Sequence, residues 1–129
     1  MSEENKAIVH RFVEEAFNKG NLEVLDELIA PDYVDYNPLP LEAPNREGLR
    51  RGIIKLRRAF PDLAFSVEDT IAEGDKVVIR TVWHGAHTGS EWFRRPASGQ
   101  VSRSLGIQIL RLQDGKIVEH WGATMTTWT

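Results

Sequence analysis

The sequence predicts an α+β domain in which three N-terminal helices pack on one face of a twisted antiparallel β-sheet. Two observations predict this class. Apolar residues recur at helical spacing as far as Phe60, and from Leu63 onward they alternate with polar residues as in strands. The strand-like segments are joined by very short turns, which connect antiparallel neighbours because a parallel pair needs a crossover of about a dozen residues.

Two helices are expected at the start of the chain. The first covers residues 4–19, where apolar residues share one face and Gly20 is a typical C-terminal stop. The second is short, over residues 22–29, and Pro31 interrupts it because proline lacks a backbone donor. Both helices therefore offer an apolar side for packing on the sheet.

A proline-rich loop and a third helix follow. Residues 31–45 hold four of the six prolines and predict an irregular loop of the kind that often carries function. Asn45 is a suitable N-cap for a helix whose apolar positions end at Phe60, before Pro61. The basic residues on its other sides are interpreted as a solvated helix face rather than as an anion site.

The second half of the chain predicts a meander of strands. Turn residues at Ala72–Asp75 and Gln113–Gly115 separate strands within two hairpins. The expected strands cover residues 63–70, 76–85, 100–112 and about 116–127. No internal repeat or linker is visible, so residues 1–129 are expected to form one domain.

Composition excludes several classes of protein. Hydrophobic residues make up 41% and charged residues 27% of the 129 positions, which is typical of a globular domain with its own core. The chain has no cysteine, which excludes disulfides, a cysteine nucleophile and thiolate metal sites, and it favours a reducing compartment; we expect a cytoplasmic protein.

Charge and hydropathy limit the partners. Sixteen basic and nineteen acidic residues give a net charge of −3 with no long basic tract, so nucleic acid is not an expected partner. No apolar run approaches the ~20 residues of a membrane span, and the N-terminus does not have the pattern of a secretory signal. Neither nucleic acid nor a membrane is therefore an expected partner.

Six short phrases occur in order over nearly the whole chain. They are FNKGN at 17–21, APDYVD at 30–35 with Pro38, AFPDL at 59–63, AEGDKV at 72–77, GAHTG at 85–89 and DGKIVEHW at 114–121. Taken together, they resemble the SnoaL-like polyketide cyclase family within the nuclear transport factor 2-like (NTF2-like) superfamily.

This resemblance implies a cone, in which a curved, mainly antiparallel sheet wraps the long first helix and encloses an apolar pocket. Members of the family often pair sheet to sheet, so a homodimer is expected. Its cyclases close a ring by intramolecular aldol condensation without a metal or an organic cofactor, and we expect neither here. Because other relatives are hydroxylases or isomerases, the fold alone does not fix the reaction.

The sequence departs from the family pattern where acidic residues are usual. The resemblance implies a catalytic aspartate just past the Glu-His-Trp phrase, but the chain has Gly122 and Met125 there and no acidic residue after Glu119. A loop histidine and aspartate are replaced by Tyr36 and Asn37, and an aspartate of the third strand by Gln108. The base of the family's cyclases therefore cannot be carried over to this chain.

Three other residues are candidate bases for removing a proton next to a carbonyl. Glu119 shares a face with Ile117 and Trp121 if the strand alternates regularly, which would aim it into the cone, although an ion pair with an arginine is the alternative. Asp35 lies in the loop, where it can instead bond its own backbone. His87 lies between two glycines, where pocket-lining and a structural hydrogen bond are equally expected.

Further residues are expected to bind the substrate. Tyr36, Asn37 and Gln108 can hydrogen-bond a carbonyl or an oxyanion. Aromatic walls would suit a cyclic ligand, with core packing as the alternative role for each ring. These aromatic candidates are Phe12, Phe60, Trp83, Trp92 and Trp121.

His120 should face away from a pocket that Trp121 lines, because neighbouring strand residues alternate between faces; a structural or interface role is expected for it. Two hypotheses for the function follow from these candidates. The first is a cofactor-independent cyclase or isomerase acting on a hydrophobic carbonyl compound. The second is a non-catalytic binding protein with the same cone, which the missing aspartate favours.

Overall fold

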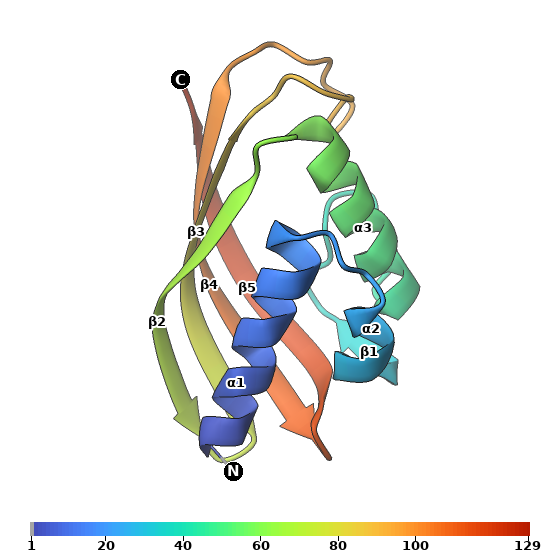
Figure 1. The fold of residues 1–129 in the computed structure, drawn as a ribbon, viewed down its shortest axis with the longest axis vertical. Coiled ribbons are helices and arrows are strands. Elements are labelled where there is room, and N and C mark those ends of the chain that lie inside the picture. The colour runs from blue at the N-terminus through green and yellow to red at the C-terminus, as the bar shows by residue number, and fades with distance from the viewer. Residues whose placement is uncertain (1) are drawn as a thin grey trace.

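The computed structural model describes residues 2–129, which form a five-stranded sheet with its helices gathered on one side (Figure 1). The sheet curves around the N-terminal helix, and the apolar side chains of both meet in one core. The architecture is the α+β class that the change of hydrophobic period predicts.

The helical half is less regular than predicted. α1 covers Ser2–Phe12 and continues directly into a π-helical segment, η1, over Val13–Asn18. α2 has only five residues, Val24–Leu28, and α3 covers Arg46–Ala59. Asn45 caps α3 as expected, accepting a hydrogen bond from a backbone N–H at 2.9 Å. The prediction of three N-terminal helices is therefore only partly right, because α2 is little more than one turn.

The sheet has the strand order β1-β5-β4-β3-β2. Its last four strands pair as an antiparallel meander, as predicted, and β1 adds to the edge parallel to β5. The strands are β1 Ile29–Asp35, β2 Ala64–Glu73, β3 Lys76–Ala86, β4 Val101–Gln113 and β5 Lys116–Trp128.

The start of the predicted loop is a strand, so the loop prediction is wrong for residues 31–35. Pro31 is tolerated there because β1 is an edge strand and needs fewer ladder donors. The pairing sets Asp35 beside His120 on β5. A residue expected in an irregular loop is therefore held by the sheet.

A β-bulge near the start of β5 reverses the expected alternation. Leu112 of β4 pairs with Ile117 and Arg111 pairs with Glu119, which leaves Val118 as an extra residue in β5. Because the bulge shifts the period by one, Ile117 and His120 face the inside of the sheet and Glu119 faces the outside. Every later residue of β5 is displaced to the other face as well.

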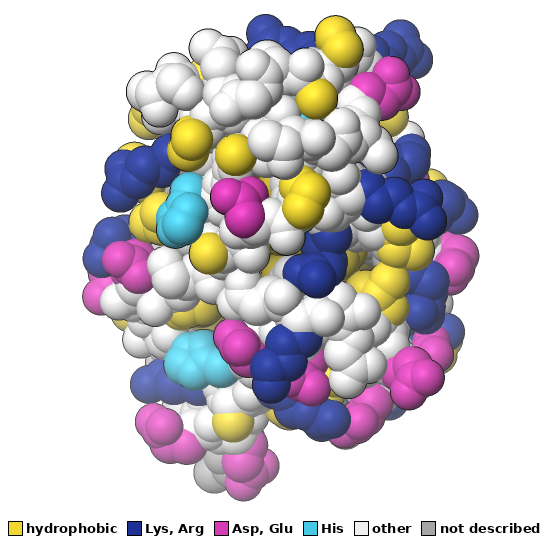
Figure 2. All heavy atoms as spheres, turned by 45° about the horizontal axis from the view of Figure 1, so that its top comes forward, with side chains coloured by type: hydrophobic (Ala, Val, Ile, Leu, Met, Phe, Trp, Pro, Cys, Tyr) yellow, Lys and Arg dark blue, Asp and Glu magenta, His cyan; other side chains and the backbone are white. Residues whose placement is uncertain are grey.

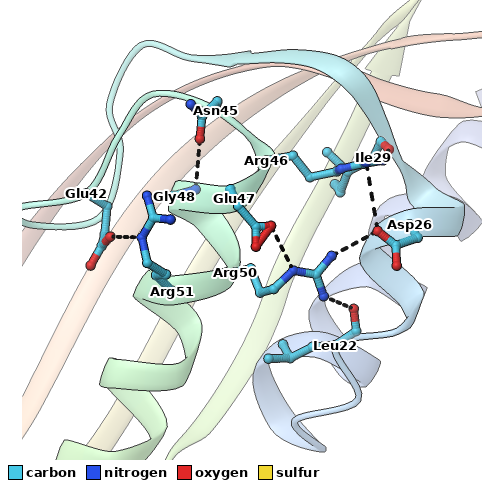
Figure 3. Close-up of polar contacts among 10 residues, drawn as sticks. All are labelled: Leu22, Asp26, Ile29, Glu42, Asn45, Arg46, Glu47, Gly48, Arg50 and Arg51. Carbon is cyan, nitrogen blue, oxygen red and sulfur yellow. Dashed lines mark hydrogen bonds and ion pairs between the residues drawn. The ribbon is translucent and has the colours of Figure 1, made fainter.

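The basic residues of α3 join it to α2 as well as facing solvent (Figure 3). The Arg50 guanidinium donates to the Leu22 carbonyl at 3.1 Å and to Asp26 Oδ1 at 2.9 Å. Arg46 donates to the Ile29 carbonyl at 3.2 Å. These contacts satisfy backbone acceptors just before α2 and at the start of β1, so the interpretation of a solvated face does not hold for Arg50.

The surface does not gather charge of one sign on the face that Figure 2 shows, where acidic and basic side chains are intermixed with small apolar groups. Among residues 2–129, no helix is both long and apolar enough to cross a lipid bilayer. A cavity lies inside the cone, and it is described next.

Candidate functional site

A cavity of about 380 Å³ lies between the inner face of the sheet and the helices. Small-molecule sites usually have volumes of about 300–1,000 Å³. Most of the wall is apolar, with aromatic side chains from the N-terminal helix, from β2 and β3 and from the segment between β3 and β4: Phe12, Phe17, Phe65, Trp83, Trp92 and Phe93. Such a wall fits a hydrophobic, cyclic ligand.

A polar cluster interrupts this apolar wall where β1 meets β5. Asp35 is buried, with 4% of its surface exposed, and its carboxylate accepts three hydrogen bonds. Tyr33 Oη donates to Oδ2 at 2.8 Å, and the backbone N–H of Asn37 donates to Oδ1 at 3.0 Å. His120 Nδ1 lies 2.6 Å from the same Oδ1. A buried carboxylate is stable here because each of its oxygens has a donor.

The His120 imidazole is held at both ring nitrogens. Nδ1 lies 2.6 Å from Oδ1 of Asp35, and Nε2 lies 2.6 Å from Oε1 of Gln108 on β4. Because both oxygens can only accept, both ring nitrogens donate in this arrangement. A carboxylate on one nitrogen fixes the orientation of the ring and stabilises the positive charge that it gains when Nε2 takes a proton. A histidine held in this way on a carboxylate has the geometry of a general base once Nε2 has lost its proton and its contact with Gln108.

Tyr33 is a donor in this cluster rather than an acid. Burial raises the pKa of Tyr33, and the negative charge and hydrogen bond of Asp35 raise that pKa further. The phenol is therefore protonated at every ordinary pH and keeps its hydrogen bond to Asp35.

The loop after β1 is tied to the same cluster. Asn37 Oδ1 accepts from the backbone N–H of Gly122 at 2.9 Å, and both residues line the cavity. Leu39, two residues further on, lines the cavity and packs against Gly52 of α3. The first part of the loop thus forms one wall of the cavity and is held by β5 and α3.

Six of the residues expected at the site line the cavity. Asp35, Asn37 and Gln108 belong to its polar part, and three aromatic residues belong to the apolar wall, namely Phe12, Trp83 and Trp92. Their roles toward a ligand remain predictions, because the structure holds none.

Glu119 does not point into the cavity, and that expectation is wrong because of the bulge at Val118. Its carboxylate forms an ion pair with Arg111 and accepts from Tyr36 Oη at 2.7 Å. Tyr36 stacks on Trp121 with ring centroids 5.1 Å apart. Because this group lies on the outer face of the sheet, the expected pocket positions of Tyr36 and Trp121 are wrong as well.

His87 and Phe60 lie behind the cavity wall. The His87 ring is 1% exposed, and its Nε2 donates to the Ser90 carbonyl at 2.8 Å. Phe60 is fully buried, 5.1 Å from the His87 ring and 5.2 Å from that of Trp83, measured between centroids. Neither lines the cavity, so the structural alternatives hold for both, and Phe60 supports the aromatic wall from behind.

The main residue that the sequence analysis misplaced is His120. Strand alternation put it on the outer face, and only the bulge brings it into the cavity. Tyr33, Ser104 and Thr126 also line the cavity without having been expected there. Alternation from the buried Leu110 predicts an inward Ser104, since the two are an even number of residues apart on β4.

Gly122 and Met125, the positions where the resemblance implies an acid, lie on opposite faces of β5. Gly122 lines the cavity, whereas Met125 is on the outer face with 69% of its surface exposed.

Within residues 2–129, no group of three or more histidine, aspartate and glutamate side chains is arranged to hold a metal ion.

Comparisons with known proteins give a consistent result. A model of the SnoaL-like polyketide cyclase family matches residues 7–124. No curated protein matches the chain by sequence. Many solved structures match, among them TsrD from Streptomyces laurentii, which is 29% identical with a TM-score of 0.82 over 95% of this chain and 88% of that one.

Two further structures show how reactions vary among similar folds. IdmH from Streptomyces antibioticus, provisionally assigned as a polyketide cyclase, is 34% identical with a TM-score of 0.78, over 93% of this chain and 91% of that one. AclR from Streptomyces galilaeus, provisionally assigned as a hydroxylase, is 28% identical with a TM-score of 0.81, over 97% and 91%. These likenesses confirm the NTF2-like fold and leave the reaction to be argued from the site.

Proposed function

Because the chain belongs to the SnoaL-like polyketide cyclase family, we propose that it is a cofactor-independent enzyme of the cyclase or isomerase kind, acting on a hydrophobic carbonyl compound in the cavity. The observation that carries this proposal is the Asp35–His120 pair, which sets a histidine base on an acidic partner inside an otherwise apolar, aromatic-lined cavity. Core packing alone does not require such a pair, since buried charge is costly.

In the proposed reaction, His120 Nε2 removes a proton from the carbon next to a substrate carbonyl. The C–H bond breaks, its electron pair forms the enolate, and Asp35 balances the charge of the imidazolium. In a cyclase, the enolate carbon attacks a second carbonyl carbon of the same molecule and a C–C bond forms. The resulting alkoxide takes the proton back from Nε2, so the step needs no outside acid, base or oxidant.

Neutral donors support the negative charge that moves through these steps. Ser104 and Thr126 line the cavity, with their hydroxyl oxygens 2.7 Å apart, and the amide group of Asn37 lines it too. Hydroxyl and amide donors in an apolar cavity stabilise an enolate or alkoxide more than they do in water. The proposed site therefore has a base, its orienting acid and oxyanion donors.

The alternative is a binding protein with the same cavity. It is favoured by Gly122, which stands at a position where the resemblance implies the catalytic acid. It is also favoured by Gln108, whose Oε1 accepts a hydrogen bond from Nε2, so that this nitrogen carries a proton. In that case the Asp35–His120 pair would recognise a polar group of the ligand without moving a proton.

A ligand screen with product analysis separates the two functions. Hydroxynaphthoquinones and bicyclic or tricyclic aromatic diketones are tested by thermal shift and by tryptophan quenching, because Trp83 and Trp92 line the cavity. For any compound that is converted, we expect His120→Gln to lower kcat by about 10²- to 10⁴-fold, the usual contribution of a general base, with little change in binding.

His84→Gln is the matched control, since His84 is an exposed histidine of the neighbouring β3. We expect it to leave kcat and binding unchanged. Conversion at the wild-type rate by the His120 variant would remove His120 from the proposed chemistry. Binding without conversion of any compound would favour the carrier.

We also propose a homodimer formed through the outer face of the sheet. This face exposes apolar side chains on adjacent strands β4 and β5: Leu105, Ile107 and Met125 are each between 44% and 69% exposed. Light scattering should then give twice the monomer mass of 14.7 kDa, and a monomer mass at micromolar concentration would contradict the proposal.

A further inference from the structure

The base nitrogen of the proposed site is already occupied. Nε2 of His120 is 2.6 Å from Gln108 Oε1, while Nδ1 is bonded to Asp35. A base must present a free nitrogen to the proton that it removes, within about 2.6–3.2 Å. In the structure, therefore, the Gln108 side chain lies in the place where the substrate must react.

Two glycines make the space in which the Gln108 amide lies. A Cβ atom at Gly122 would be 2.0 Å from Gln108 Oε1, and a Cβ atom at Gly106 would be 2.8 Å from its Nε2. Gly122 pairs with Gln108 across β4 and β5, and Gly106 precedes it by two positions on the same face of β4. The amide thus lies over two neighbouring positions of the inner surface that have no Cβ atom.

We propose that Gln108 is a gate on His120: its amide covers the base nitrogen in the free protein, and a substrate opens the site by displacing it. This inference rests on the proposed role of His120 as the base. It makes Gln108 a positioning residue with two places, one over Nε2 and one beside the bound ligand.

The displaced amide gives the gate a consequence for substrate class. A glutamine amide has both an acceptor oxygen and a donor NH₂ group. A ligand that moves the oxygen away from Nε2 must offer the amide a new partner, since an unpaired polar group in an apolar cavity is unfavourable. A ketone oxygen next to the acidic C–H can accept from the NH₂ group, and it does so more strongly as the enolate forms.

The gate therefore favours enolisable ketones over hydrocarbons of the same shape. An apolar ring can pack against the aromatic wall, but it offers no hydrogen-bond partner that could replace the contact between Nε2 and the Gln108 amide. By contrast, if Gln108 has a fixed structural role, its amide should cover Nε2 in the presence of any ligand, and only removal of the amide should uncover the nitrogen.

Chemical modification of the free protein tests the cover without a substrate. Diethylpyrocarbonate acylates a free, neutral imidazole nitrogen, forming an N–C bond and releasing ethanol and carbon dioxide. Rates at each histidine are measured by mass spectrometry of peptides at pH 7, with the exposed His84 as an internal reference. We expect His120 to react about tenfold faster in Gln108→Ala, because a cover held by ~1.4 kcal/mol is open about one-tenth of the time.

Matched variants define the control. Gln113→Ala removes an exposed glutamine at the end of the same strand and should leave the His120 rate unchanged. Gly122→Ala should leave the His120 rate low, because a Cβ atom there would lie 2.9 Å from Nε2 itself as well as 2.0 Å from the amide oxygen, and so replaces one cover by another. Melting temperatures are measured in parallel, so that only folded variants are compared.

A second measurement tests opening by a ligand. In wild-type protein, backbone and side-chain amide NMR signals of ¹⁵N-labelled glutamine are followed on addition of 1,3-diketo-naphthalene and of naphthalene itself. We expect the Gln108 side-chain signal to shift with the diketone and not with the hydrocarbon. A His120 rate in Gln108→Ala within twofold of wild type overturns the gate.

The gate and the proposed function fail in different ways. If His120→Gln retains turnover while Gln108→Ala exposes His120 to modification, the cover exists but the chemistry lies elsewhere. If His120→Gln abolishes turnover while Gln108→Ala leaves the modification rate unchanged, the base stands and the gate is wrong.

Discussion

Replacing Asp35 by asparagine tests whether the polar cluster is held together by its charge. The carboxylate accepts from the Tyr33 hydroxyl, the Asn37 backbone N–H and His120 Nδ1, and it is 4% exposed. An asparagine of the same shape keeps one acceptor oxygen and sets an NH₂ group where the second oxygen was. It also removes the negative charge that faces the imidazole.

The expected loss follows from these contacts. Hydrogen bonds to a charged group contribute about 1.5–3 kcal/mol each, and asparagine retains weaker versions of two of the three, so Asp35→Asn should lower the free energy of unfolding by about 2 kcal/mol. For a domain of this size, that corresponds to a fall in melting temperature of roughly 6–10 °C. Asp35→Ala should cost more, because it leaves buried donors without an acceptor.

Urea unfolding followed by tryptophan fluorescence measures this loss, with Asp32→Asn as the matched control. Asp32 is an exposed aspartate of the same strand, and its replacement should change stability by less than about 0.5 kcal/mol. A double-mutant cycle with His120→Gln should give a coupling energy of about 1 kcal/mol or more. Equal stability of the two asparagine variants, or strictly additive effects in the cycle, would refute the reasoning.

Two further predictions concern the surface. The ion pair with Arg111 holds the pKa of Glu119 below its usual range, so its contribution is present above the unfolded-state pKa and is lost as pH falls through the folded one. Urea unfolding should therefore show wild type more stable than Glu119→Gln above about pH 5 and the difference shrinking in acid, whereas a pH-independent difference would contradict the assignment. Phe93 and Arg94 have positive φ angles of 53° and 64° in a two-residue hairpin turn, so replacing them by Asn-Gly should raise stability by about 1 kcal/mol in the same assay; a loss would mean that Phe93 packing outweighs the strain.

Periodicity predicted the order of elements because it reflects which face of each segment is buried. The change of period after Pro61 and the turns at Gly74 and Gly115 were sufficient to place the four strands of the meander. β1 was not predicted for two reasons. The burial of its residues does not alternate, and it contains Pro31, which a strand tolerates here only because β1 lies at the edge of the sheet. That place is a property of the sheet, not of the segment.

The sequence predicted several residues of the apolar wall, but it did not predict that His120, the proposed base, lies in the cavity. Trp83 and Trp92 were expected from their elements, and Asp35 from its loop. The position of His120 depended on a single extra residue, Val118, that opposes nothing in β4. No local signal marks a bulge of this kind, because it results from pairing between strands. One residue of register thus exchanged Glu119 for His120 in the cavity.

The departures from the family pattern at positions 108 and 122 are one physical change rather than two. Gln108 Oε1 occupies the volume where a side chain at Gly122 would begin, since a Cβ atom there would be 2.0 Å away. An acid at 122 therefore requires that the amide leave His120, and the amide requires that 122 have no side chain. With Gly122 in place of an acid, the carboxylate of the cluster is that of Asp35, which lines the cavity and contacts the His120 ring. The loss of the acid on β5 thus does not by itself argue against the proposed enzyme, because in that proposal the base is His120 of the pair that spans β1 and β5.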